Sequence, residues 1–134
     1  MDQTQATRGS AYWAGWVMSG LVIAFLLMDA TMKLLALPIV IESGAALGWN
    51  GGADQARELG VVLLACTFLY AAPQTAVLGA ILLTGFLGGA VATHVRVDSP
   101  LFSHVLFGVY LGVFVWGGLY LRDVRLRTLL PLRR

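Results

Sequence analysis

The chain has 134 residues, the length of one domain, but 58% of them are hydrophobic and only 12% are charged, about half the charged share of a soluble domain. Its net charge of +2 is small, and three stretches have no charged residue at all: residues 9–28, 59–95 and 99–121. A membrane-spanning helix needs about 20 apolar residues, so the middle stretch is long enough for two. This composition excludes a water-soluble protein and predicts four membrane spans.

The first predicted helix covers residues 11–37. The Ser10 hydroxyl can cap its start, and Pro38 disfavours helical geometry in the residue before it. About 27 residues rise about 40 Å, more than the hydrocarbon core of about 30 Å. Asp29 and Lys33 are therefore expected toward the membrane surface and not at its centre. The stretch lacks a basic leader and a small-residue cleavage site, so we expect it to be retained and not removed as a signal peptide.

Three further helices are predicted from similar start signals, over residues 54–72, 73–94 and 99–121. Asp54 can cap the first of these, and Pro73 suits the first turn of the second. Ser99 followed by Pro100 is a favourable cap and first-turn pair for the third. Residues 38–53 then form the longest connection, and loops of this length are usually functional or partly disordered.

The distribution of arginine predicts the orientation. Four spans put both termini on one side, where the tails carry six arginines, Arg8 and five in the basic tail 122–134. The two opposite loops carry only Arg57 and Arg96. Since Lys and Arg are enriched on the cytoplasmic side, both termini are predicted to be cytoplasmic. We attribute the basic tail to contact with membrane lipids and not with nucleic acid.

The predicted fold is therefore all-α: one domain, residues 1–134, forming an integral-membrane four-helix transmembrane bundle. Glycines recur at four-residue spacing in its last two helices, as Gly85 with Gly89 and Gly108 with Gly112. This spacing allows helices to approach closely in lipid, so both pairs are predicted to be packing surfaces.

Ionisable residues of the predicted helices gather at the outer end of the bundle, where such groups usually face the interior or a wet cavity. Asp29 and Lys33 lie one turn apart with the acid first, so they can pair. We predict Asp29 and His104 as a proton-transfer pair. Lys33, His94 and Arg96 are predicted to bind the ligand. The structural alternative is that Lys33 reaches toward the headgroups while Asp29 neutralises its charge.

A metal site is not predicted, and the sequence leaves the cofactor, if any, unknown. Two histidines on different helices are a weak signal for a metal or haem without a cysteine or a repeated Glu-x-x-His. The alternative is that His94 caps a helix end and His104 bonds a neighbouring loop. Nucleotide, flavin and iron–sulfur motifs are lacking. Cys66 is the one cysteine, which excludes an internal disulfide and a two-cysteine redox motif.

Three segments resemble a known family: MDATMKLLALP (residues 28–38), PQTAVLGAILLTGFLGGAVATHVRV (residues 73–97) and WGGLYLRDVRLRTLLPLRR (residues 116–134). They are similar to the DoxX-like family of small four-helix membrane proteins, over residues 14–134. Gln74 departs from the family pattern, which has an arginine after the proline. Lys33, His94 and Arg96 match it. The resemblance implies a bacterial inner-membrane protein, and no catalytic role is carried over to these residues.

Three functions are compatible with the sequence. The leading hypothesis is a membrane protein that binds a small lipophilic molecule, a quinone or a lipid, in an outer-leaflet polar pocket, as a redox-associated subunit. The quinone enters by analogy, because the family takes its name from a subunit associated with a membrane thiosulfate:quinone oxidoreductase. The second is a cofactor-free enzyme that performs acid and base chemistry on a lipophilic substrate. The third is a structural partner that assembles, with itself or a redox subunit, through its glycine faces.

Overall fold

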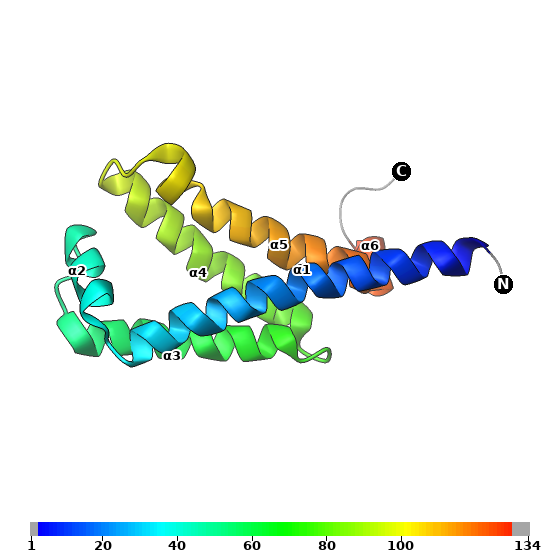
Figure 1. Ribbon diagram of the computed structural model, residues 1–134, viewed down its shortest axis with the longest axis horizontal. Helices are drawn as coiled ribbons and strands as arrows, with labels where there is room; N and C mark the ends of the chain where they lie inside the picture. Colours follow the sequence, from blue (N-terminus) through cyan, green and yellow to red (C-terminus); the bar gives the residue numbers. More distant parts are fainter. Residues whose placement is uncertain (1–2, 130–134) are drawn as a thin grey trace.

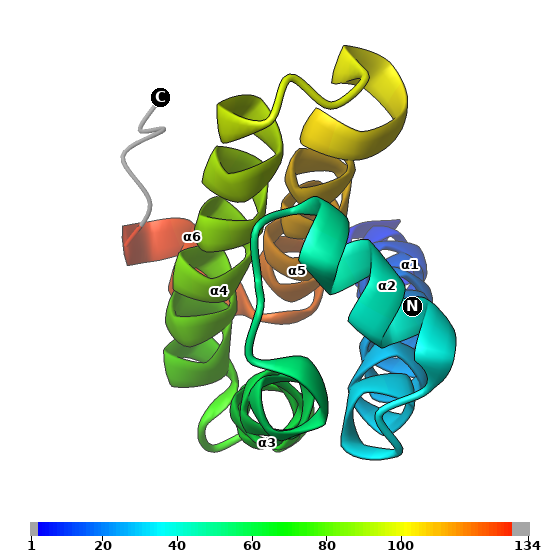
Figure 2. The ribbon, with the colours of Figure 1, turned by 90° about the vertical axis from the view of Figure 1, so that its left-hand side faces the viewer.

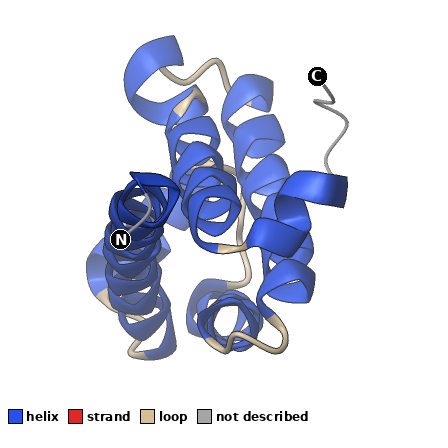
Figure 3. Cartoon of the chain, turned by 90° about the vertical axis from the view of Figure 1, so that its right-hand side faces the viewer, coloured by secondary structure: helices blue, strands red, loops and turns tan. Residues whose placement is uncertain are grey.

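The computed structural model describes residues 3–129, in which every regular element is a helix (Figure 3). In chain order the elements are α1 (Gln3–Leu34), α2 (Pro38–Ala46), α3 (Gly52–Ala71), α4 (Ala76–Arg96), the π-helix η1 (Leu101–Val105), α5 (Phe107–Arg122) and α6 (Val124–Leu129) (Figure 1). The predicted all-α class is confirmed for this part of the chain.

Three segments are long and apolar enough to cross a membrane, namely Gly9–Leu34, Ala76–Arg96 and Leu101–Arg122. The remaining long helix, α3, has 20 residues but carries Asp54, Arg57 and Glu58 in its first two turns. Its uncharged part, residues 59–71, rises only about 20 Å, less than the hydrocarbon thickness of about 30 Å. The chain therefore has the helices of a membrane protein, with three candidate spans in its described residues.

The four long helices pack around one core. α1 contacts α3 and α5, and α4 contacts the same two helices from the other side. In Figure 1, α1 and α3 diverge from α4 and α5 toward the end of the molecule that carries α2, which we call the α2 end. The core extends from Ala30 and Leu26 of α1, near the α2 end, into the opposite half, where it includes the fully buried Tyr70, Ala80, Leu83, Val115 and Leu119.

A buried polar network ties three helices together in the half opposite the α2 end. The Arg122 Nε donates to Ser19 Oγ at 3.0 Å, Ser19 and the Tyr70 hydroxyl are bonded at 2.9 Å, and Tyr70 donates to the Val115 carbonyl at 2.7 Å. The Arg122 guanidinium also stacks on the Trp16 ring, 4.2 Å from its centroid. Polar groups in an apolar interior must be paired in this way, so the network fixes the relative positions of α1, α3 and α5.

Glycine makes the closest helix contacts possible, but mostly not at the predicted positions. A Cβ on Gly15 would lie 2.7 Å from the Gly118 carbonyl oxygen, so α1 and α5 can meet there only without side chains. Gly108 is a packing position as predicted, since its Cβ would lie 2.8 Å from Val91 Cγ2. A Cβ on any of the other three would meet no atom within 4 Å, so these glycines make no close helix contact among the described residues: Gly85, Gly89 and Gly112. Their role as packing surfaces stays a prediction.

Helix α2 lies in the segment predicted to be a loop, residues 38–53. Pro38 occupies its first turn, and the extended backbone of Leu37 satisfies the restriction that proline places on the preceding residue. Every residue of α2 is at least partly exposed, and the helix packs against α3. Figure 2 shows it in front of the space between the diverging helices. A short helix of this kind has too few buried positions to reveal itself through hydrophobic periodicity.

The other helix boundaries differ from the predicted ones by a few residues to two turns. α1 begins at Gln3, before Ser10, and ends at Leu34. The predicted helix 73–94 begins at Ala76, because residues Ala72 to Thr75 form the turn between α3 and α4. The predicted helix 99–121 opens with the π-helical turn η1. Single π-turns within helices are rare and occur often at functional sites.

Candidate functional site

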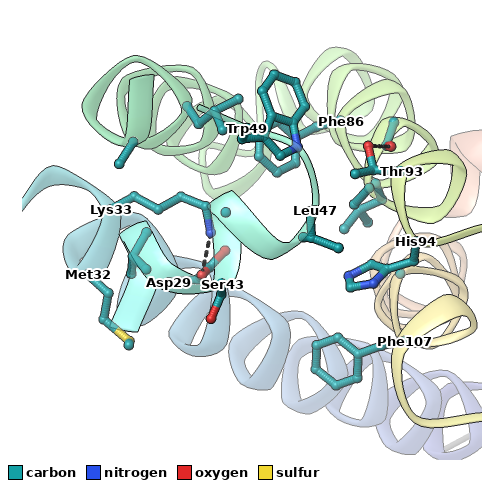
Figure 4. A pocket seen from close by; sticks show the side chains of 18 of the residues that line it. Asp29, Met32, Lys33, Ser43, Leu47, Trp49, Phe86, Thr93, His94 and Phe107 are labelled. Atoms are coloured by element: carbon teal, nitrogen blue, oxygen red, sulfur yellow. Dashed lines mark hydrogen bonds and ion pairs between the residues drawn. The ribbon is translucent and has the colours of Figure 1, made fainter. Parts of the chain in front are cut away.

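The diverging helices enclose a cavity of about 760 Å³ at the α2 end. Its walls come from α1, α3, α4 and α5, and residues of α2 and the following loop cover it (Figure 4). Most of the lining is apolar, including Phe25, Phe86, Leu87 and Phe107. The volume lies within the range of about 300 to 1,000 Å³ that is typical of small-molecule sites.

The first polar group of the cavity wall is an ion pair on α1. Lys33 Nζ lies 2.6 Å from Asp29 Oδ1, and both residues line the cavity. The Lys33 side chain is 19% exposed and that of Asp29 is 32% exposed. Gly60 of α3 leaves room for the stem of Lys33, because a Cβ there would lie 3.0 Å from Lys33 Cβ. The predicted pairing of Asp29 with Lys33 is confirmed.

The second polar group is a pair of histidines from α4 and η1. The rings of His94 and His104 meet edge to face, with centroids 5.7 Å apart, and both residues line the cavity. Their Nδ1 atoms are each bonded to a serine hydroxyl: His94 to Ser99 at 2.9 Å and His104 to Ser103 at 2.7 Å. Figure 4 shows His94 across the cavity from the ion pair. A ligand could therefore meet polar groups at two separate points.

Asp29 and His104 line the same cavity without a direct bond among the described residues. Asp29 is bonded to Lys33, and His104 to Ser103. A proton could pass between the two only through a substrate or water lying in the cavity. Their role as a proton-transfer pair stays a prediction.

Arg96 occupies a different place from the other predicted ligand-binding residues. Its Nη2 atom donates to the Leu47 carbonyl oxygen at 2.6 Å and lies against Gly48, whose φ of +88° favours glycine. It is not one of the residues that line the cavity. In this structure Arg96 attaches the loop after α2 to the end of α4, and a direct contact with ligand stays a prediction.

Several cavity residues could not be identified from the sequence. Ser43 and Trp49 reach the cavity because α2 and its loop fold over the diverging helices, and Gln55 and Thr93 line its sides. Thr93 donates to the carbonyl of Gly89, and Gln55 accepts from the Gly51 amide. The length of the connection 38–53 was the indication from the sequence that this segment could contribute to a site.

Neither a metal centre nor a reactive thiol is apparent. In the described range, 3–129, no three His, Cys, Asp or Glu side chains are placed to hold a metal ion. Cys66 lies in the core at 7% exposure, away from the cavity lining. The polar chemistry available to a ligand is therefore that of carboxylate, ammonium, imidazole, hydroxyl and amide groups.

Comparison with known proteins identifies the family and nothing more specific. The search of curated proteins gave no match, and neither did the search of solved structures. The family model described as the DoxX-like family matches residues 17–118, which includes α2 to α4 and most of the cavity lining. Because this match covers well over half of the sequence, the chain belongs to the DoxX-like family.

Proposed function

We propose that this protein is a four-span inner-membrane bundle that holds a small lipophilic molecule, a quinone or a lipid, in the cavity at the α2 end. The observation that carries the proposal is the cavity itself: about 760 Å³, mostly apolar, with polar groups at two separate points of its wall. A molecule with an apolar body and a polar head matches that lining.

In this proposal α3 is the fourth span, with its charged first turns at the membrane surface and residues 59–71 within the membrane. Its position between α1 and α4 supports this, because both neighbours are candidate spans. The α2 end then faces outward and both termini face the cytoplasm. The arginines of α6 support this orientation: Arg127 donates to the carbonyls of Tyr120 and Leu121 at the end of α5, and Arg125 is exposed and available to anionic headgroups.

A second candidate function is acid and base catalysis without a cofactor on the same class of molecule. One observation favours it: a carboxylate, an ammonium group and two imidazoles line a single cavity. The bound molecule would then be a substrate, with Asp29 and His104 exchanging protons with it. A redox-associated role and a partner subunit stay predictions from family resemblance.

The test is to identify what the protein carries when it is purified in mild detergent. Lipophilic molecules extracted from the parent are compared by mass spectrometry with those from Ala90→Trp, which places an indole ring in the cavity lining, and from Ala92→Trp. Ala92 lies on the same helix but is exposed and outside the cavity lining, so it is a matched control. We expect one molecular species to be retained by the parent and the control and lost from Ala90→Trp. The same extract from all three proteins would refute the proposal.

A further inference from the structure

The charges in the cavity wall already neutralise each other. Lys33 and Asp29 contribute one cation and one anion, and their 2.6 Å contact makes a direct ion pair. Both side chains are mostly buried, so solvent screens this pair only weakly. A ligand thus meets a wall with no unpaired charge from these two residues.

The other charged side chains near the α2 end do not line the cavity. Arg96 is bonded to the Leu47 carbonyl, and Arg57 lies 3.6 Å from Asp54 on the exposed side of α3. Glu42 and Glu58 are exposed and do not line the cavity. None of the ionised side chains in the described part of the chain is free to act as a counter-ion inside the cavity.

His94 and His104 are the remaining cavity-lining residues with titratable side chains. Each uses its Nδ1 atom in a bond with a serine hydroxyl, an arrangement that a neutral imidazole satisfies as donor or acceptor. With both imidazoles neutral, the cavity wall as a whole carries no net charge. Resting on the function proposed above, we propose that the cavity selects an uncharged lipophile over an ionised lipophile of the same size.

An ionised head group would find no counter-ion of its own in the cavity wall. A carboxylate or phosphate would have to share the Lys33 ammonium with Asp29 or draw it away, and in both cases one negative charge in a mostly buried wall is left without a cation of its own. An ammonium head would strand Lys33 in the same way. An ester, ketone or alcohol needs only a hydrogen bond, and the Lys33 ammonium group has three donors, of which one is used by Asp29. Figure 4 shows Ser43 beside the pair, where its hydroxyl can also reach such a head.

The test uses two probes of nearly the same size and different charge, spin-labelled stearic acid and its methyl ester. The protein is placed in nanodiscs of zwitterionic lipid at an alkaline pH, so that the acid is ionised although the apolar surroundings raise its pKa. Electron paramagnetic resonance then measures the immobilised fraction of each probe. Probe in the cavity gives the immobilised signal that is lost in Ala90→Trp but kept in Ala92→Trp. Probe in the lipid around the helices gives the signal that is the same in both variants.

We expect the parent to bind the ester at least about tenfold more tightly than the acid, because rejection comes from an unpaired buried charge. Asp29→Asn releases Lys33 and should reverse the preference toward the acid. Asp54→Asn makes the same charge change on the exposed face of α3 and should leave the preference as in the parent. The doubly neutral variant Asp29→Asn/Lys33→Met should prefer the ester again, and it also shows whether loss of one partner has merely unfolded the protein.

Equal binding of ester and acid in the cavity of the parent would overturn this inference and leave the proposed function standing. The inference would also be overturned if Asp29→Asn stayed folded and kept the preference of the parent for the ester. A signal that is identical in Ala90→Trp and Ala92→Trp for both probes would mean that the cavity holds neither, and both proposals would then fail.

Discussion

Replacing either Asp29 or Lys33 alone should lower the free energy of unfolding, because the remaining partner keeps an unpaired charge. Replacing both should restore part of that loss. The perturbation is a double-mutant cycle of Asp29→Asn, Lys33→Met and the double variant. In Lys33→Met the carboxylate loses its 2.6 Å partner while remaining two-thirds buried. In the double variant the same wall is neutral and no charge is stranded.

The magnitude follows from the partial burial of the pair. Breaking a fully buried ion pair costs about 3 to 5 kcal/mol, whereas an exposed pair contributes about 0 to 1 kcal/mol. Lys33 and Asp29 are 19% and 32% exposed, so their coupling should lie between these limits, at about 2 kcal/mol. Each single variant is then destabilised by about that amount, and the double variant by clearly less than the sum.

Unfolding by SDS in mixed micelles, followed by circular dichroism, measures the free energy of each variant. The pair Asp54–Arg57 is an internal control of the same charge type: its side chains are 93% and 54% exposed and its closest atoms are 3.6 Å apart. The equivalent cycle with Asp54→Asn and Arg57→Met should give a coupling below about 1 kcal/mol. Additive losses for the Asp29–Lys33 cycle would show that the two side chains do not stabilise each other.

Three further predictions concern topology, the buried network and the thiol. In a Cys66→Ala background, Ser43→Cys should be labelled by an impermeant maleimide in intact cells and Thr128→Cys should be protected; the opposite pattern would reverse the orientation. Tyr70→Phe removes the bond to the Ser19 hydroxyl, which keeps Arg122 as a partner, and the side-chain donor to the Val115 carbonyl; it should cost about 1 to 3 kcal/mol in the same unfolding assay, while retained lipophiles stay unchanged. Cys66→Ala alone should fold and bind like the parent, because a buried thiol in apolar surroundings is unreactive; loss of ligand in that variant would count against this.

The parts of the fold that depend on local sequence were predictable. Uncharged length identified the long helices, and the four-residue spacing of Asp29 and Lys33 predicted their contact, because both properties are fixed within one helix. The gathering of ionisable residues at one end of the predicted bundle also indicated the end of the molecule that holds the cavity. His94 and His104 reach one another because the turn between α4 and η1 is short.

The parts that depend on contacts between distant segments were not predictable. Helix α2 folds over the cavity through the bond of Arg96 to Leu47, which are 49 residues apart. Tyr70 and Arg122 belong to a network whose members lie on three helices. Of the glycines at four-residue spacing, Gly108 alone makes a close helix contact among the described residues, because the rotation of each helix about its axis is set by packing and not by the spacing itself.

Native mass spectrometry of the intact protein released from nanodiscs shows whether the cavity holds a lipophilic molecule. We expect one bound lipophilic molecule per chain in the parent and in Ala92→Trp, retained after loosely held lipids are stripped, and none in Ala90→Trp. A parent that is bare after stripping, or an Ala90→Trp variant that carries the same adduct, would contradict the proposed function.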